Sequence, residues 1–97
     1  MAGWFDAREA QQFGVTLADF LMERIPPTAV DDSEEFSLKR QEALHKMRLQ
    51  IEVFKVEHKL NLFKKAKFGN AFKWKLLDAG YATEFADHLT RALLLRM

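Results

Sequence analysis

A long segment without glycine or proline constrains this chain most, because it favours one extended element. Residues 33–66 contain neither residue type, whereas Pro26-Pro27 precede the segment and Gly69 follows it. Apolar residues recur within it at intervals of three and four, which is the period of an α-helix rather than of a strand. We therefore expect a helix over this whole segment, about 50 Å long at 1.5 Å per residue.

The expected helix is apolar on two opposite faces. The first face spans an arc of about 80° on the helix surface. It comprises Leu44, Met47, Ile51, Phe54, His58 and Leu62. The second face is centred roughly 180° away. It comprises Leu49, Val53, Val56, Leu60 and Phe63. Both faces advance in the alternating four- and three-residue steps of coiled coils, and a helix with two apolar faces has to be covered on both.

A single chain of this size is too small to cover both apolar faces of the expected helix. A compact domain of 97 residues has a diameter of roughly 30–35 Å, which is shorter than the expected helix. We therefore predict a homo-oligomer, most simply a two-fold dimer, whose interface is the second face: Leu49, Val53, Val56, Leu60 and Phe63. The alternative is that the helix breaks near its middle and folds back into a monomeric bundle.

Another helix is expected ahead of this segment. Asp6 is predicted as its N-cap, and Phe5 is expected to pack against Ala10. Pro26-Pro27 ends this helix, because proline cannot donate a backbone hydrogen bond. Gly14 lies on its apolar face, which predicts a close approach by another helix.

Turn signals divide the remainder of the chain. Gly69-Asn70 predicts a break or kink, followed by a short helix over residues 70–79 that ends with Gly80 at its C′ position. Thr83 is the expected cap of the last helix. The sequence therefore predicts an all-α fold in a single domain, residues 1–97. We expect a small helical bundle of three main helices plus a short one, built around a long central helix.

Composition narrows the class of protein. Hydrophobic residues make up 48% of the chain and charged residues 30%, which is the balance of a soluble globular domain. Cysteine is absent, so disulfides and thiolate metal sites are excluded. No apolar run approaches the roughly 18–20 residues that cross a bilayer, and the first residues do not have the pattern of a signal peptide. We expect a soluble cytoplasmic protein without a membrane partner.

A basic segment offers a second interpretation. Residues 64–75 read KKAKFGNAFKWK, and the wider region 58–77 contains no acidic residue. A nucleic-acid surface would need its lysines on one face, with aromatic rings free to stack on bases. On a continuous helix the lysines instead surround the axis, while Phe68, Phe72 and Leu76 follow the spacing of a buried stripe. We expect the three aromatic residues of this segment, Phe68, Phe72 and Trp74, in the core and the lysines in solvent. The candidate anion contacts are Lys64, Lys65, Lys67, Lys73 and Lys75.

Chemical motifs are missing from the sequence. The three histidines, His45, His58 and His88, do not have the spacing of metal ligands. No nucleophile motif or glycine-rich phosphate loop is present, so we predict no catalytic residue and no cofactor, and a non-enzymatic role is favoured. A helix-turn-helix is disfavoured because Glu84 and Asp87 begin the last helix, where phosphate would be repelled. The predicted function is a self-associating protein–protein interaction or assembly module; the alternative is a nucleic-acid-associated protein that uses region 58–77.

Overall fold

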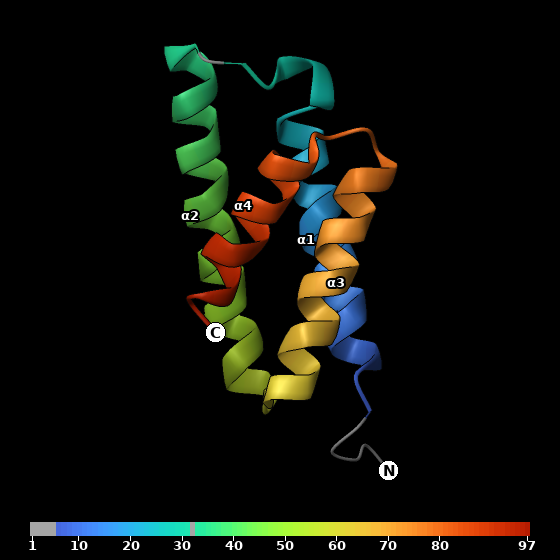
Figure 1. Ribbon diagram of the computed structural model, residues 1–97. Helices are drawn as coiled ribbons and strands as arrows, with labels where there is room; N and C mark the ends of the chain where they lie inside the picture. Colours follow the sequence, from blue (N-terminus) through green and yellow to red (C-terminus); the bar gives the residue numbers. More distant parts are fainter. Residues whose placement is uncertain (1–5, 32) are drawn as a thin grey trace.

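The computed structural model describes residues 6–31 and 33–97, and within these ranges it contains helices but no strands. Four α-helices form a bundle (Figure 1). They are α1 (Arg8–Arg24), α2 (Glu34–Glu57), α3 (Leu62–Asp78) and α4 (Thr83–Leu94), with a short 3₁₀ turn at Pro27–Ala29 after α1. The predicted all-α bundle is confirmed: α2 is the longest helix, with 24 residues, and α4 the shortest, with 12.

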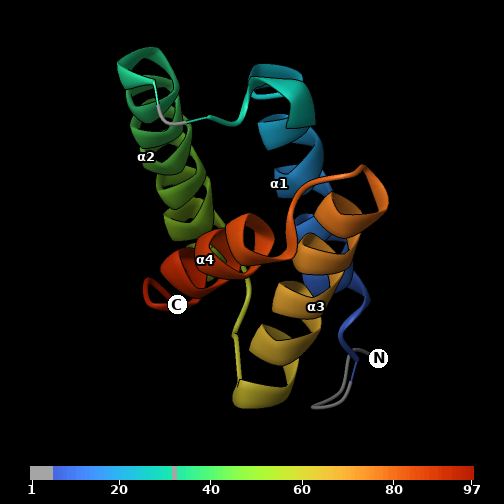
Figure 2. The same cartoon turned by 45° about the horizontal axis from the view of Figure 1, so that its top comes forward.

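The helices are unevenly packed against one another. α1 and α3 run in the same direction and make the closest contact of any pair, whereas α2 runs in the opposite direction and contacts α1 and α4 more loosely. α4 lies obliquely across the space between α2 and α3 (Figure 2). All four helices contribute to one core. Its largest fully buried side chains are Leu17, Leu21, Ile25, Met47, Ile51, Phe68, Phe72, Leu76, Leu89 and Leu93.

Gly14 explains the close approach of α1 and α3. A Cβ atom at this position would lie 2.6 Å from the carbonyl oxygen of Phe68 and 3.1 Å from the backbone nitrogen of Phe72. These are backbone atoms of a packed helix, so they cannot yield as the end of a side chain can. The close helix–helix contact predicted from this glycine is confirmed.

Gly80 ends α3 as predicted. Its φ of 98° lies in the left-handed region that glycine adopts without strain. The amide of Gly80 donates to the carbonyl of Leu77 and that of Tyr81 to the carbonyl of Leu76, both at 3.1 Å, which is a Schellman motif. Tyr81 is then buried, and its hydroxyl donates to the carbonyl of Ile25 at the end of α1. The α3–α4 turn is thereby joined to the end of the first helix.

The prediction of one helix over residues 33–66 is wrong at its C-terminal end. α2 ends at Glu57, residues 58–61 are not helical, and α3 begins at Leu62; the backbone is extended at His58 and at Asn61. Asn61 caps α3, because its side-chain oxygen accepts a hydrogen bond of 2.8 Å from the amide of Lys64. Folding back at this point puts Met47 and Phe72 in one core. The chain therefore folds back on itself, as in the alternative expectation, but at residues 58–61 rather than near the middle of the segment.

The break predicted at Gly69-Asn70 is also wrong, since α3 continues through both residues. Gly69 is buried, and a Cβ there would lie 3.3 Å from the Cδ1 atom of Leu94. The glycine therefore permits close packing of α4 on α3 without ending the helix. As a result the shortest helix is α4 rather than a segment over residues 70–79.

Neither predicted N-cap has the expected geometry. The N-cap of α1 is Ala7, and the Asp6 carboxylate instead accepts a bond of 3.3 Å from the amide of Arg8. Thr83 is the first residue of α4, whose N-cap is Ala82 without a side-chain bond. Phe5, predicted to pack on Ala10, lies outside the described residues.

Candidate interaction surface

Large apolar side chains remain exposed along the side of α2 that faces away from the core. We call Leu38, Leu49, Val53 and Val56 the outer face of α2. Their exposed fractions are 59%, 54%, 60% and 88%. The opposite side of the helix is buried through Ala43, Met47, Ile51 and Phe54. Both apolar faces expected from the sequence are therefore present, and the chain's own helices cover only one.

The structure places the five predicted interface residues in two groups. Leu49, Val53 and Val56 share the outer face of α2. Leu60 lies in the connection between α2 and α3 and Phe63 in the first turn of α3, and both are half-buried. The helix break separates the two groups.

Charged side chains flank the outer face of α2 in pairs of opposite sign. Glu42 and Lys46 are 3.1 Å apart and Glu52 and Lys55 are 3.2 Å apart, each pair within one turn of the helix. The helix as a whole carries five acidic and five basic side chains. The surface around the exposed apolar residues is therefore neutral overall and alternates in sign along its length.

The end of the chain extends the apolar surface. Leu95, just after α4, is 86% exposed and lines a shallow hollow of about 490 Å³ together with Leu49. The Nζ atom of Lys55 donates a bond of 3.1 Å to the carbonyl of Arg96, which holds this segment beside α2. Leu95 was not among the predicted interface residues, although the helical period already places it about 180° from Ala86 and away from the buried side of α4.

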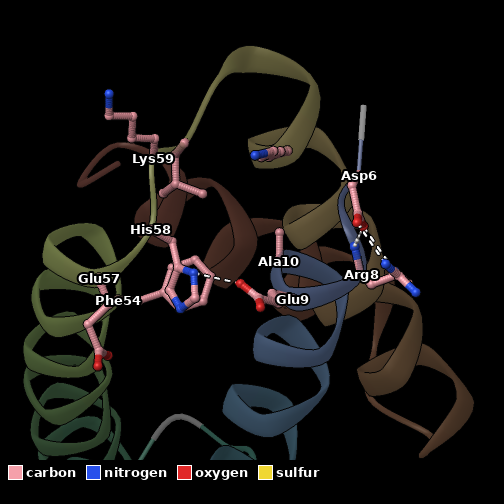
Figure 3. A pocket seen from close by; sticks show the side chains of 10 residues that line it. Asp6, Arg8, Glu9, Ala10, Phe54, Glu57, His58 and Lys59 are labelled. Atoms are coloured by element: carbon pink, nitrogen blue, oxygen red, sulfur yellow. Dashed lines mark hydrogen bonds and ion pairs between the residues drawn. The ribbon is translucent and has the colours of Figure 1, made fainter. Parts of the chain in front are cut away.

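A second hollow, of about 570 Å³, lies where α2 ends beside the start of α1 (Figure 3). His58 stacks on Phe54, with ring centroids 4.3 Å apart, and its Nδ1 atom lies 2.6 Å from Oε2 of Glu9. The Lys59 side chain points away from this pair. The His58–Glu9 contact joins α1 to the end of α2.

Asp6 and Arg8 form an ion pair on the other side of the same hollow. The carboxylate and guanidinium are 2.8 Å apart. The side-chain hydrogen bond from Arg8, with a further bond from the Arg8 amide, lowers the pKa of Asp6 to about 2. Among the described residues that line this hollow, none is a serine, threonine or cysteine that a base could activate as a nucleophile.

The lysines of α3 are distributed around the helix, as its period predicts. Lys73 Nζ lies 3.4 Å from Asp87 of α4, while Lys67 Nζ lies 5.4 Å from the ring centre of Phe63. Lys75 is exposed, and Lys64 and Lys65 are half-buried near the start of the helix. The structure does not gather the five candidate anion contacts into one patch.

The aromatic residues of the basic segment divide into two groups. Phe68 and Phe72 are completely buried, as expected. Trp74, by contrast, is 60% exposed. The prediction that the aromatic residues of this segment lie in the core is therefore correct for the two phenylalanines and wrong for the tryptophan. A wheel drawn through an unbroken α3 would have revealed this, because Trp74 lies opposite the Phe68–Phe72–Leu76 stripe.

Comparisons with known proteins give no match from which the role of this surface could be inferred. No family model matches this sequence, and neither characterised proteins nor solved structures yield a significant match. In the part of the chain that the structure describes, no helix is both long enough and apolar enough to span a bilayer. Among the same residues, no group of three or more metal-ligating side chains occurs.

Proposed function

We propose that this protein is a self-associating helical assembly module of the cytoplasm, and that the outer face of α2 is its interface. The observation that carries the proposal is the row of exposed apolar side chains on this face. Burying a Leu or Val side chain contributes about 1.5–3 kcal/mol, so four partly exposed ones contribute on the order of 4–8 kcal/mol per chain before the cost of association. Contiguous apolar patches are typical of protein interfaces.

A second copy of the chain fits this face better than a strongly charged partner does. The five acidic and five basic residues of α2 cancel, so two copies do not repel each other. Rotation about a two-fold axis brings the same patch from each chain together, and alternating charges on the two helices can then pair at the rim. The proposed complex is a two-fold homodimer.

The test is the mass of the protein in solution. The mass of the wild type, measured by light scattering, should rise with concentration from the monomer value of 11.3 kDa towards twice that value. Val56→Glu should remain monomeric, because it buries an unpaired charge in the interface. The side chain of Val56 is largely exposed in the single chain, so the helical circular dichroism of this variant should be unchanged.

Gln41→Glu is the matched control. It adds the same charge to an exposed position of the same helix, at the edge of the outer face and about 80° from its centre. This variant should dimerise as the wild type does. A wild type that keeps the monomer mass at high concentration would contradict the proposal.

Trp74 favours a second candidate function, association with nucleic acid. α3 carries five lysines and a single carboxylate, and Lys67 lies on the same side of the helix as this exposed indole, about two turns away. Stacking of bases on an aromatic ring with lysines nearby is a common mode of single-strand binding. Anisotropy of a labelled single strand should then show salt-sensitive binding that Trp74→Ala weakens. Binding should also be lost when Lys64, Lys65 and Lys67 are all replaced by Gln.

A further inference from the structure

The connection between α2 and α3 interrupts a hydrophobic pattern that is continuous on either side of it. If α2 is extended at 100° per residue through residues 58–61, the buried residues of both helices fall within one arc of about 100°. These residues are Ala43, Met47, Ile51, Phe54, Phe68, Gly69, Phe72 and Leu76. If residues 58–61 were always bent, the buried residues of α2 and α3 would not need to lie at matching angles on one extended helix.

The exposed large apolar residues of the two helices agree less completely. On the extended helix, Leu38, Leu49, Val53 and Val56 of α2 and Trp74 of α3 fall within an arc of about 60°, on the side opposite the buried arc. Leu62 of α3 is also exposed but lies outside this arc, beside the buried one. A joined α2–α3 helix would therefore have one face for the existing core and an outer face that includes Trp74.

We propose that residues 58–61 are a hinge and that the protein self-associates by exchange. In the exchanged dimer α2 and α3 join into a single helix, and α1–α2 of each chain packs on α3–α4 of its partner. The inference rests on the proposed self-association but gives it a different contact from docking through the outer face of α2, because the exchanged halves of the core join the two chains. The partner is a second copy of this chain, which supplies the other half of the core.

The hinge sequence is compatible with both states. His58, Lys59, Leu60 and Asn61 include neither glycine nor proline, so the backbone can be extended or helical. His58 has φ −135° and ψ 136°, and Asn61 has φ −114° and ψ 177°. The bent state is held locally by the Asn61 cap and by the contact of His58 with Glu9.

The way the helices pack allows the main contact of the core to be recovered after exchange. The main interface of the core joins α1 to α3, and these helices lie on opposite sides of the hinge. Opening the hinge separates α1 from its own α3, and the same contact can re-form with α3 of the partner. The tight fit at Gly14 is then recovered between chains.

Leu62→Pro distinguishes the two states. Leu62 is the first residue of α3 and is 84% exposed, so proline is tolerated there in the bent chain. The extended backbone of Asn61 also suits a residue before proline. In the joined helix the same proline would lie in the interior and break it. We expect Leu62→Pro to be a folded monomer and Leu62→Ala, the matched control, to dimerise.

A distance measurement tests the wild-type helix geometry directly. The chain lacks cysteine, so spin labels can be attached to cysteines introduced at the exposed Gln41 and Asp78. Diluting the labelled chain with excess unlabelled chain isolates the distance within one molecule. A joined helix separates these positions by about 55 Å, which exceeds the 46 Å extent of the bent chain.

The outcomes separate the two proposals. A dimer with the long distance, lost in Leu62→Pro, supports exchange. A wild-type dimer with a distance below 46 Å, retained in Leu62→Pro, overturns exchange and leaves docking of bent chains through α2. A wild type that is monomeric at every concentration overturns both self-association and exchange.

Discussion

Two glycines in helix interiors meet different neighbours, and the difference predicts opposite effects of the same substitution. At Gly14 a Cβ would lie 2.6 Å from a backbone oxygen of α3, whereas at Gly69 it would lie 3.3 Å from the end of the Leu94 side chain. A backbone atom in a packed core moves only with its helix, while a flexible side chain can yield by a few tenths of an ångström.

We expect Gly14→Ala to lower the free energy of unfolding by about 1–3 kcal/mol, because α1 must move away from α3. Gly69→Ala should raise it by up to about 1 kcal/mol, since alanine is the better helix former. Urea unfolding measures both. Equal effects of the two variants would contradict the close contact at Gly14.

Phe72 and Trp74 provide a second contrast at this scale. Phe72 is completely buried and Trp74 is largely exposed. Phe72→Ala should cost about 3–5 kcal/mol of stability. Trp74→Ala should change the free energy of unfolding by only about 0.5 kcal/mol, as is usual for surface positions. A large loss of stability in Trp74→Ala would show that the indole packs against the fold.

At the scale of single helices, the ion pair between Asp6 and Arg8 at the start of α1 makes the free energy of unfolding depend on pH. The pKa of Asp6 is lowered from 3.8 to about 2 by its bonds to Arg8, so the folded state favours the charged carboxylate. The stabilisation is therefore complete above about pH 4 and is lost as the pH falls through about 2. Asp6→Asn should lower the urea midpoint at pH 7 and have little effect at pH 2.

Arg8→Gln provides the control for this pair. In that background Asp6→Asn should have a smaller effect at pH 7, because the main partner of the carboxylate is gone. An effect of Asp6→Asn that is the same at pH 7 and pH 2 would rule out the ion pair as its cause.

The all-α class of the fold could be predicted from the sequence, whereas the ends of the helices were predicted less well. The apolar period identified all-α structure, and Gly80 was correctly assigned because a left-handed residue is required after α3. The bend at residues 58–61 was missed because neither glycine nor proline marks it. The chain bends there because this allows Phe72 to be buried against the other helices. Gly69 was misread as a breaker because its contact with α4 is a property of the tertiary fold. The exposure of Trp74 follows from the period of an unbroken α3, so it was missed only because a break was expected at Gly69-Asn70.

For the whole molecule, the uneven packing predicts uneven protection of the backbone. α1 and α3 form the tightest contact, and α2 is covered on one side only. Local opening should therefore be easier in α2. Hydrogen exchange at low concentration should show weaker protection for residues 38–53 than for residues 10–21. Protection of α2 should then increase with concentration; uniform and constant protection would contradict this account.

The parallel contact between α1 and α3 has a consequence for synthesis on the ribosome. The surface that covers Gly14 is formed by Phe68 and Phe72, which are translated long after α1 is complete. At 5–20 residues per second, the first helix waits roughly 3–10 s for its partner. During that interval the nascent chain exposes the apolar sides of both α1 and α2. Chains growing side by side on one messenger would therefore meet while each still lacks its own α3.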